Sequence, residues 1–275
     1  MIPTKPVTAR RLLLKFLRKQ APGAIVRYRD LHGMGASAAA VAMALTRLQQ
    51  EGVVQRVAKG SYRVPVAGRF GPMPATEQQV LQSLLQQPGG KLRGYPTGVA
   101  AFNRLGLTTQ VAREVEIATP RPGRPRQIGA VRVRYVPSQG EARPDEVPLR
   151  QLLDALRRLK RLPDANPATA LRQLRNQLAQ LTAEDQQRLA RLALAYNPAT
   201  RALVGALLDG LGKEQLTAKL YASLNPLTHY RLGIEDPAVA NRKKWRIQLL
   251  CTPMRKLFGR RCGPRPGRWG CRKPS

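Results

Sequence analysis

The stretch "ASAAAVAMALTRLQQ", residues 36–50, decides the fold of the first part of the chain. Its larger apolar residues recur at the spacing of one helix face, which predicts an amphipathic helix buried along Val41, Ala44, Leu45 and Leu48. Ser37 is a favoured residue at the start of a helix, and Gly52 is a favoured residue just after the end of one. The helix carries one charge, Arg47, although the chain has a formal net charge of +32.

The segments on either side of this helix predict short helices and strands. Residues 7–20 predict a helix capped by Thr8, and residues 24–26 predict a short strand. A helical turn is expected over 28–35. The runs 53–58 and 61–64 predict a hairpin about Lys59–Gly60. Helix, strand, helix, helix, hairpin is the order of a winged helix-turn-helix. In that fold the helix 36–50 would read DNA and the Lys59–Gly60 turn would be the tip of the wing.

The charge is the largest signal in the composition. The chain of 275 residues has 48 Lys and Arg against 16 Asp and Glu, and its sequence pI is near 11.6. Such an excess indicates a polyanionic partner, with nucleic acid ahead of an anionic membrane surface. No apolar run approaches the roughly 20 residues that span a bilayer, and the first residues have no signal-peptide core. We therefore expect a cytoplasmic protein without a membrane partner.

A second region follows the Gly- and Pro-rich linker 66–74. Thr76 and Gln79 form a capping box for a helix over 77–87. Two strands are expected, over 113–119 and 130–136. Glu114 and Glu116 share one face of the first strand, and Arg132 and Arg134 share one face of the second. If the strands pair, these faces carry complementary charge. The connection between them, 120–129, predicts an exposed basic loop that contains Arg121, Arg124 and Arg126.

From about residue 147 the pattern is wholly helical. Two of the helices begin with the same signature, an Asn cap followed by Pro, at Asn166 and Asn197. The end of the chain, 242–275, has 12 basic residues and no acidic ones. It cannot build a core, so it is expected to be a disordered tail or a nucleic-acid-binding arm.

The predicted fold class is therefore mainly α with small β elements, that is, α+β. The expected domains are a winged-helix DNA-binding domain, an α+β domain with a β-hairpin, a helical C-terminal region and a basic tail, at 1–67, 75–146, 147–247 and 248–275.

The sequence has no arrangement typical of an enzyme. It lacks a phosphate-binding GxxxxGK[ST] loop and the HExxH zinc motif, and its two histidines are far apart. The adjacent Glu235 and Asp236 are typical of a turn or a helix start. The cysteines are spaced too widely for a zinc site, at Cys251, Cys262 and Cys271. We expect no catalytic residues, no metal and no cofactor.

Residues 28–65, "YRDLHGMGASAAAVAMALTRLQQEGVVQRVAKGSYRVP", resemble the winged-helix start of the AbiEi-type antitoxins of the type IV toxin–antitoxin class. Residues 94–136, from "GYPTGVAAFNRLG" to "VRVRYV", are similar to the segment that follows in one branch of that family, and the likeness continues to about residue 247. It implies an antitoxin-like domain after the winged helix. It also implies a regulator that represses its own operon and opposes a nucleotidyltransferase-type toxin without a stable complex. Relatives have an arginine where this chain has Ala38.

The expected DNA contacts fall into two groups. Base edges would be read from the helix 36–50 by Ser37, Thr46, Arg47 and Gln50. The phosphate backbone would be bound by Arg27 and Arg29 before that helix and by Arg56, Lys59 and Arg63 in the hairpin. Two other functions stay open, a general winged-helix regulator or protein-docking module and an RNA-binding protein.

Overall fold

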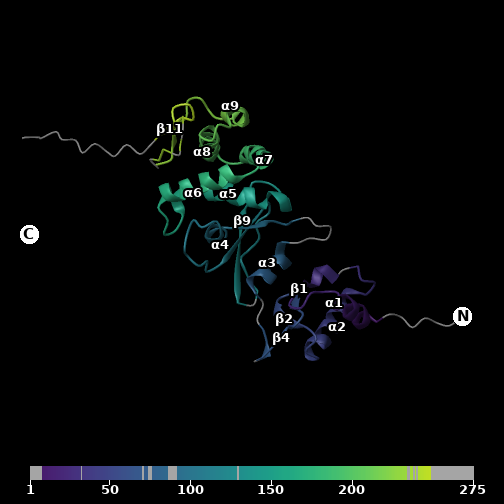
Figure 1. Ribbon diagram of the computed structural model, residues 1–275. Coiled ribbons are helices and arrows are strands. Elements are labelled where there is room, and N and C mark those ends of the chain that lie inside the picture. Colours follow the sequence, from purple (N-terminus) through teal and green to yellow (C-terminus); the bar gives the residue numbers. More distant parts are fainter. Residues whose placement is uncertain are drawn as a thin grey trace, which may run out of the picture.

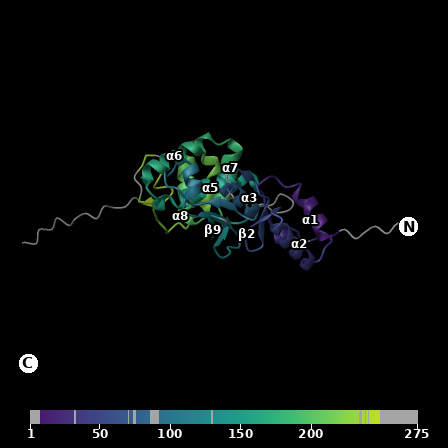
Figure 2. The same ribbon diagram turned by 90° about the horizontal axis from the view of Figure 1, so that it is seen from below.

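The computed structural model describes residues 8–31, 33–69, 71–73, 76–85, 92–128, 130–233, 236–237, 239 and 241–248. These residues form a mixed α and β structure, which confirms the predicted α+β class. An N-terminal unit lies at one end, a four-stranded sheet lies in the middle and a group of helices lies at the other end (Figures 1 and 2). The expectation that 242–275 adds nothing to a core is wrong for its first residues, because Trp245 and Ile247 are buried in the core of the helical region. The predicted tail beyond residue 248, with its three cysteines, and Glu235 lie outside the described residues.

The N-terminal unit is built from two helices, a 3₁₀ turn and a three-stranded sheet. The elements are α1 (Ala9–Leu17), β1 (Ile25–Arg27), η1 (Tyr28–Leu31), α2 (Ala38–Gln50), β2 (Gln55–Ala58) and β3 (Ser61–Arg63). The sheet order is β1-β3-β2, and both pairs are antiparallel. Thr8 lies at the start of α1, but its side chain makes no capping hydrogen bond.

The core of this unit joins α1 to the buried face of α2. All four residues of the predicted stripe are buried: Val41, Ala44, Leu45 and Leu48. They pack with Leu13, Leu17 and Val26 in one apolar cluster. The Ser37 hydroxyl accepts a hydrogen bond from the Ala40 amide at 3.2 Å, so the predicted cap is confirmed.

The middle sheet has the order β6-β7-β9-β8. Its strands are β6 (Tyr95–Thr97), β7 (Val115–Thr119), β8 (Arg126–Ile128) and β9 (Val131–Pro137), accompanied by α3 (Glu77–Leu85) and α4 (Val99–Arg104). A two-residue ribbon of β4 (Ala67–Gly68) and β5 (Gly71–Pro72) precedes α3. The capping box is confirmed, because Thr76 and Gln79 exchange hydrogen bonds of 3.1 and 3.3 Å.

One expectation for this sheet needs correction. The two expected strands, β7 and β9, pair in parallel, and β9 also pairs antiparallel with β8. The segment 120–129 is therefore not wholly a loop: Arg121 and Arg124 are exposed as expected, whereas Arg126 begins the edge strand β8. The strand forms there because Ile128 enters an apolar cluster with β7 and β9.

The expected charge pairing across the sheet holds for one arginine. Arg134 contacts both Glu114 and Glu116 at 2.6 Å. The pairing predicted for Arg132 is wrong, because this residue lies opposite Gln127 of β8 and makes no ion pair with any described residue. The second partner of Glu116 comes from the C-terminal region, where Arg158 binds it at 2.6 Å.

The C-terminal region is dominated by helices. These are α5 (Val147–Arg157), α6 (Pro167–Gln180), α7 (Ala183–Ala193), α8 (Pro198–Asp209) and α9 (Ala218–Ala222), with 3₁₀ turns η2 (Pro144–Glu146), η3 (Leu159–Arg161) and η4 (Glu214–Leu216). The Asn166 and Asn197 caps are confirmed. The region is not wholly helical, because β10 (Tyr230–Arg231) and β11 (Ile247–Gln248) pair in parallel.

A buried carboxylate joins the middle sheet to the helices. Asp154 of α5 accepts hydrogen bonds from the hydroxyls of Tyr95 at 3.0 Å, Thr97 at 2.8 Å and Tyr196 at 3.0 Å. Burial raises the pKa of Asp154 by more than these hydrogen bonds lower it. Three segments that are distant in the sequence therefore meet at one acidic group: β6, α5 and the turn that follows α7.

A second buried carboxylate holds the end of the described chain against α8. Asp209 accepts hydrogen bonds from the Trp245 indole at 2.8 Å, from Thr217 at 2.9 Å and from Lys244 at 2.6 Å. Burial would raise the pKa of Asp209, but these hydrogen bonds together lower it. Trp245 is fully buried on Gly205, where any Cβ would collide with the indole ring.

The raised pKa of Asp154 predicts a specific pH dependence of stability. Because the folded state binds this proton more tightly than the unfolded chain, the favourable contribution is complete below about pH 4 and is lost as the pH rises through the raised pKa. Asp154→Asn removes this dependence. Urea unfolding between pH 4 and 8 should show the free energy of unfolding of the variant improving, relative to the unmodified protein, as the pH rises.

Asp154→Ala is the matched comparison, because it leaves three hydroxyls without their acceptor. It should cost about 1–3 kcal/mol at pH 4. A difference between Asp154→Asn and the unmodified protein that does not change with pH would contradict the raised pKa.

Gly205→Ala should destabilise the protein although alanine is the better helix former by about 1 kcal/mol. The added methyl group displaces the Trp245 ring from α8 and with it the hydrogen bond to Asp209. Thermal unfolding measures the effect, and the same substitution in a Trp245→Ala background is the control. If the cost is the same in both backgrounds, the indole ring does not cause it.

Candidate nucleic-acid interface

The exposed face of α2 is made mainly of small and uncharged side chains. Beside the alanines it presents all the residues predicted to read bases, and each of them is exposed: Ser37, Thr46, Arg47 and Gln50. Met43 is 60% exposed in the middle of this face. The Thr46 hydroxyl donates to the Ala42 carbonyl at 3.1 Å, which leaves its oxygen free to accept.

Tyr28 connects the hairpin turn to the start of α2. Its backbone N–H donates to the Gly60 carbonyl at 2.8 Å, and its hydroxyl donates to the Ala38 carbonyl at 2.6 Å. Gly60 has a φ of +68°, a conformation that glycine adopts without strain. Tyr28 thereby links the Lys59–Gly60 turn to the start of α2, through its backbone on one side and its hydroxyl on the other. Sequence reasoning missed this role of Tyr28, although an aromatic residue between two arginines was a signal.

Three of the five predicted backbone-binding cations are exposed: Arg29, Arg56 and Lys59. Burial lowers the pKa of the Arg29 guanidinium, and the like charges of Arg27 and Arg126 lower it further. Because Arg126 belongs to β8, the middle sheet places a cation next to the N-terminal unit. Two neighbouring guanidiniums from different units favour an anion between or beside them.

The other two predicted cations have structural roles. Arg27 is 8% exposed, and its guanidinium binds Asp30 at 3.1 Å, three residues further on. Arg63 is 1% exposed, and it donates to the Met73 carbonyl in the segment that follows β5. The expectation that these two arginines face a phosphate backbone is not met, because neighbouring segments cover them.

The hairpin packs against the middle sheet. Ile25 of β1 belongs to an apolar cluster with α3 and with strands of the middle sheet, and Val57 and Ala58 of β2 pack against that cluster. The strand β2 lies next to β8. The cluster thus crosses the boundary expected between residues 67 and 75. As a result, the basic segment that carries Arg121, Arg124 and Arg126 is held at a fixed position relative to the hairpin.

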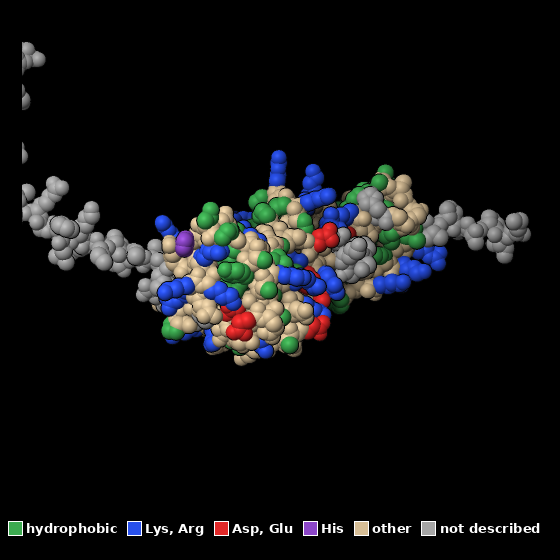
Figure 3. Space-filling model, turned by 90° about the horizontal axis from the view of Figure 1, so that it is seen from above, with side chains coloured by type: hydrophobic (Ala, Val, Ile, Leu, Met, Phe, Trp, Pro, Cys, Tyr) green, Lys and Arg blue, Asp and Glu red, His purple; other side chains and the backbone are tan. Residues whose placement is uncertain are grey.

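The far end of the molecule is basic as well. In the view from above, Lys and Arg side chains are spread along the length of the face with few acidic side chains between them (Figure 3).

Among the described residues, no group of three or more His, Cys, Asp or Glu could hold a metal ion. No helix in the described part of the chain is long and apolar enough to cross a membrane.

Comparison with known proteins gives limited similarity. Residues 13–141 match the family model DUF6088, which is described as a family of unknown function. No curated protein matches the chain. Among solved structures, the RV2827C protein from Mycobacterium tuberculosis is similar to the chain, with 17% sequence identity and a TM-score of 0.48 over 88% of this chain and 91% of that one.

The placement of Arg56 and Arg63 predicts effects of different size on stability. Arg63→Ala should lower the free energy of unfolding by about 1–3 kcal/mol, because it opens a buried site and leaves the Met73 carbonyl without its donor. Arg56→Ala, on the exposed side of the hairpin, should change it by less than about 0.5 kcal/mol. Urea unfolding compares the two, and equal effects would mean that Arg63 is not buried in solution.

Proposed function

We propose that residues 8–66 form a winged helix-turn-helix that binds double-stranded DNA, with α2 in the major groove and the Lys59–Gly60 turn as the wing tip. The observation that carries the proposal is the exposed small-residue face of α2, with the turn that bears Lys59 tied through Tyr28 to its start. A helix surfaced with alanine can approach base edges closely, and its methyl groups can contact those of thymine.

Affinity in this proposal comes chiefly from the phosphate backbone. The exposed cations Arg29, Arg56 and Lys59 belong to the same N-terminal unit as α2, and Arg126 of the middle sheet lies close to Arg29. Contacts of this kind fix the position of a protein on DNA but read no sequence. We therefore expect strong, salt-sensitive binding with modest base specificity, to which Arg47 and Gln50 contribute and which DNA shape can increase.

The resemblance to AbiEi-type antitoxins supplies the biological part of the proposal. The protein would occupy the operator of its own operon in the cytoplasm and repress it. It would also oppose a nucleotidyltransferase-type toxin, without a stable complex between the two.

A second candidate function is docking of another protein on the same face of α2. The feature that favours it is Met43, a large apolar side chain that is 60% exposed among alanines. Docking faces are depleted in charge at their centre, as this face is. The flanking arginines favour DNA over a protein.

DNA binding can be tested with paired charge reversals. Arg56→Glu with Lys59→Glu should weaken binding at least tenfold on the duplex upstream of the protein's own gene and on a scrambled duplex alike, because both residues contact phosphates. Gln50→Ala should instead change the ratio of the two affinities. Fluorescence anisotropy at several salt concentrations gives these values and the slope of log affinity against log salt.

The control is Arg191→Glu with Lys219→Glu, which makes the same change in charge on exposed residues of the helical region. It should leave most of the affinity intact. A salt slope flatter than about −3 for the unmodified protein would mean that few phosphates are engaged and would refute the proposal. Competition by RNA that equals competition by duplex DNA would favour an RNA ligand.

A further inference from the structure

A hollow of about 770 Å³ lies where the middle sheet meets the helical region. Its wall combines the end of β9, the turn η3 after α5, the beginning of α8 and Arg231 of β10. Binding sites for small molecules commonly have volumes of 300–1,000 Å³ and occur at such junctions. The hollow is therefore large enough for a molecule the size of a nucleotide.

The charge of this hollow is strongly unbalanced. Six cationic side chains line it against one carboxylate, Glu116. That carboxylate is already bound by Arg134 and Arg158, each at 2.6 Å. Arg161 and Arg231 are exposed and have no carboxylate partner among the described residues.

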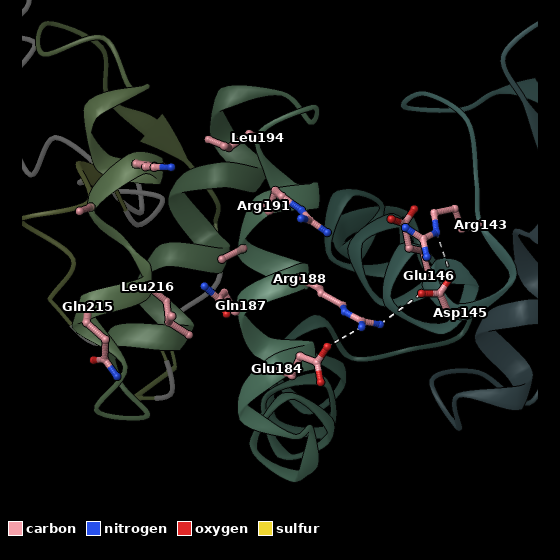
Figure 4. A pocket seen from close by; sticks show the side chains of 13 residues that line it. Arg143, Asp145, Glu146, Glu184, Gln187, Arg188, Arg191, Leu194, Gln215 and Leu216 are labelled. Carbon is pink, nitrogen blue, oxygen red and sulfur yellow. Dashed lines mark hydrogen bonds and ion pairs between the residues drawn. The ribbon is translucent and has the colours of Figure 1, made fainter.

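A second hollow, of about 630 Å³, provides an internal comparison. It lies between η2, α7 and η4, and its four cations face three carboxylates. There Arg188 bridges Glu184 and Asp145, and Asp145 also binds Arg143 (Figure 4). The positive charge is therefore largely neutralised by the protein itself. At the sheet–helix junction a single carboxylate among the described lining residues faces six cations, so the two hollows differ in what they can attract.

The cations at the junction are held in place by the fold. The backbone N–H of Arg161 donates to the Arg158 carbonyl at 2.7 Å, in a 3₁₀ turn that puts side chains three residues apart on the same side. The Lys160 ammonium donates to the Arg231 carbonyl at 2.7 Å, which ties η3 to β10. These bonds fix the backbone from which Arg158, Arg161 and Arg231 line the hollow.

The inner wall is built equally closely. Gly98 has a φ of +72°, and a Cβ at this position would lie 2.6 Å from the Glu116 carboxyl carbon. The 12-residue helix α8 adds the positive end of its dipole, because Asn197, Ala199 and Thr200 line the hollow. Like charges gathered at fixed positions repel one another, and a multivalent anion removes that repulsion. Arginine forks fit phosphate oxygens especially well.

We propose that this hollow is a binding site for a small molecule that carries a chain of phosphate groups, of the class of the nucleoside triphosphates. The site is separate from the DNA-binding face, and the proposal does not depend on DNA binding.

Isothermal titration calorimetry on the full chain, at low ionic strength and without DNA, tests the proposal with three probes. ATP and inorganic tripolyphosphate should each bind with one site per chain, and adenosine should not bind. Arg161→Glu with Arg231→Glu should weaken both anions at least tenfold. If ATP binds tighter than tripolyphosphate, the ligand is a nucleotide; if the two bind equally, it is the polyphosphate chain, and both results support the site.

The control is again Arg191→Glu with Lys219→Glu, which alters the other hollow by the same charge. It should change the affinity for ATP less than twofold. The proposal fails if neither anion binds at millimolar concentration, or if the control loses as much affinity as the test variant. It also fails if Arg161→Glu with Arg231→Glu, at an unchanged melting temperature, weakens duplex DNA but not ATP, since the hollow would then belong to the nucleic-acid interface.

Discussion

One buried carboxylate, Asp154, governs how the two larger parts of the molecule meet. Its oxygens accept hydrogen bonds from two hydroxyls of β6 and from the Tyr196 hydroxyl beyond α7, and no cation is among these hydrogen-bond donors. An acid in this environment is costly unless every bond is made, so the arrangement tolerates little displacement. The orientation of α5 that results is the one that brings Arg158 onto Glu116 of the sheet.

The burial of acidic side chains explains why the ratio of basic to acidic residues is higher on the surface than in the whole sequence. Among the acidic residues that the structure describes, five are buried in internal contacts: Glu116, Glu146, Asp154, Asp209 and Asp236. Only three arginines are buried in the described part of the chain, Arg27, Arg63 and Arg150. The protein uses its few carboxylates to hold segments together, and the cations left outside need a partner from elsewhere. Nucleic acid and small phosphate-bearing molecules are the partners whose charge fits.

The features that local sequence determines were predictable, and those that depend on distant contacts were not. The buried stripe of α2 and the caps at Ser37, Asn166 and Asn197 follow from helix geometry alone. The strand β8 was missed because the segment around it is rich in proline and arginine, which are not typical of a buried strand. Ile128 is the residue of β8 that enters an apolar cluster. Arg63 was misjudged for a similar reason, because its cover comes from Met73, beyond the linker. The exposure of the α2 residues was predicted correctly, because the buried stripe of a helix determines which residues lie on its opposite, exposed face.

The apolar cluster shared by Ile25, Val57 and Ile128 also has a mechanical meaning. A hairpin on a flexible linker can tilt independently, whereas this hairpin packs against a sheet and can tilt only if that sheet moves with it. The N-terminal unit and the middle sheet therefore move together. Any event that shifts β8 therefore acts on the hairpin, and any event that shifts the hairpin acts on the sheet, by the same coupling free energy in both directions.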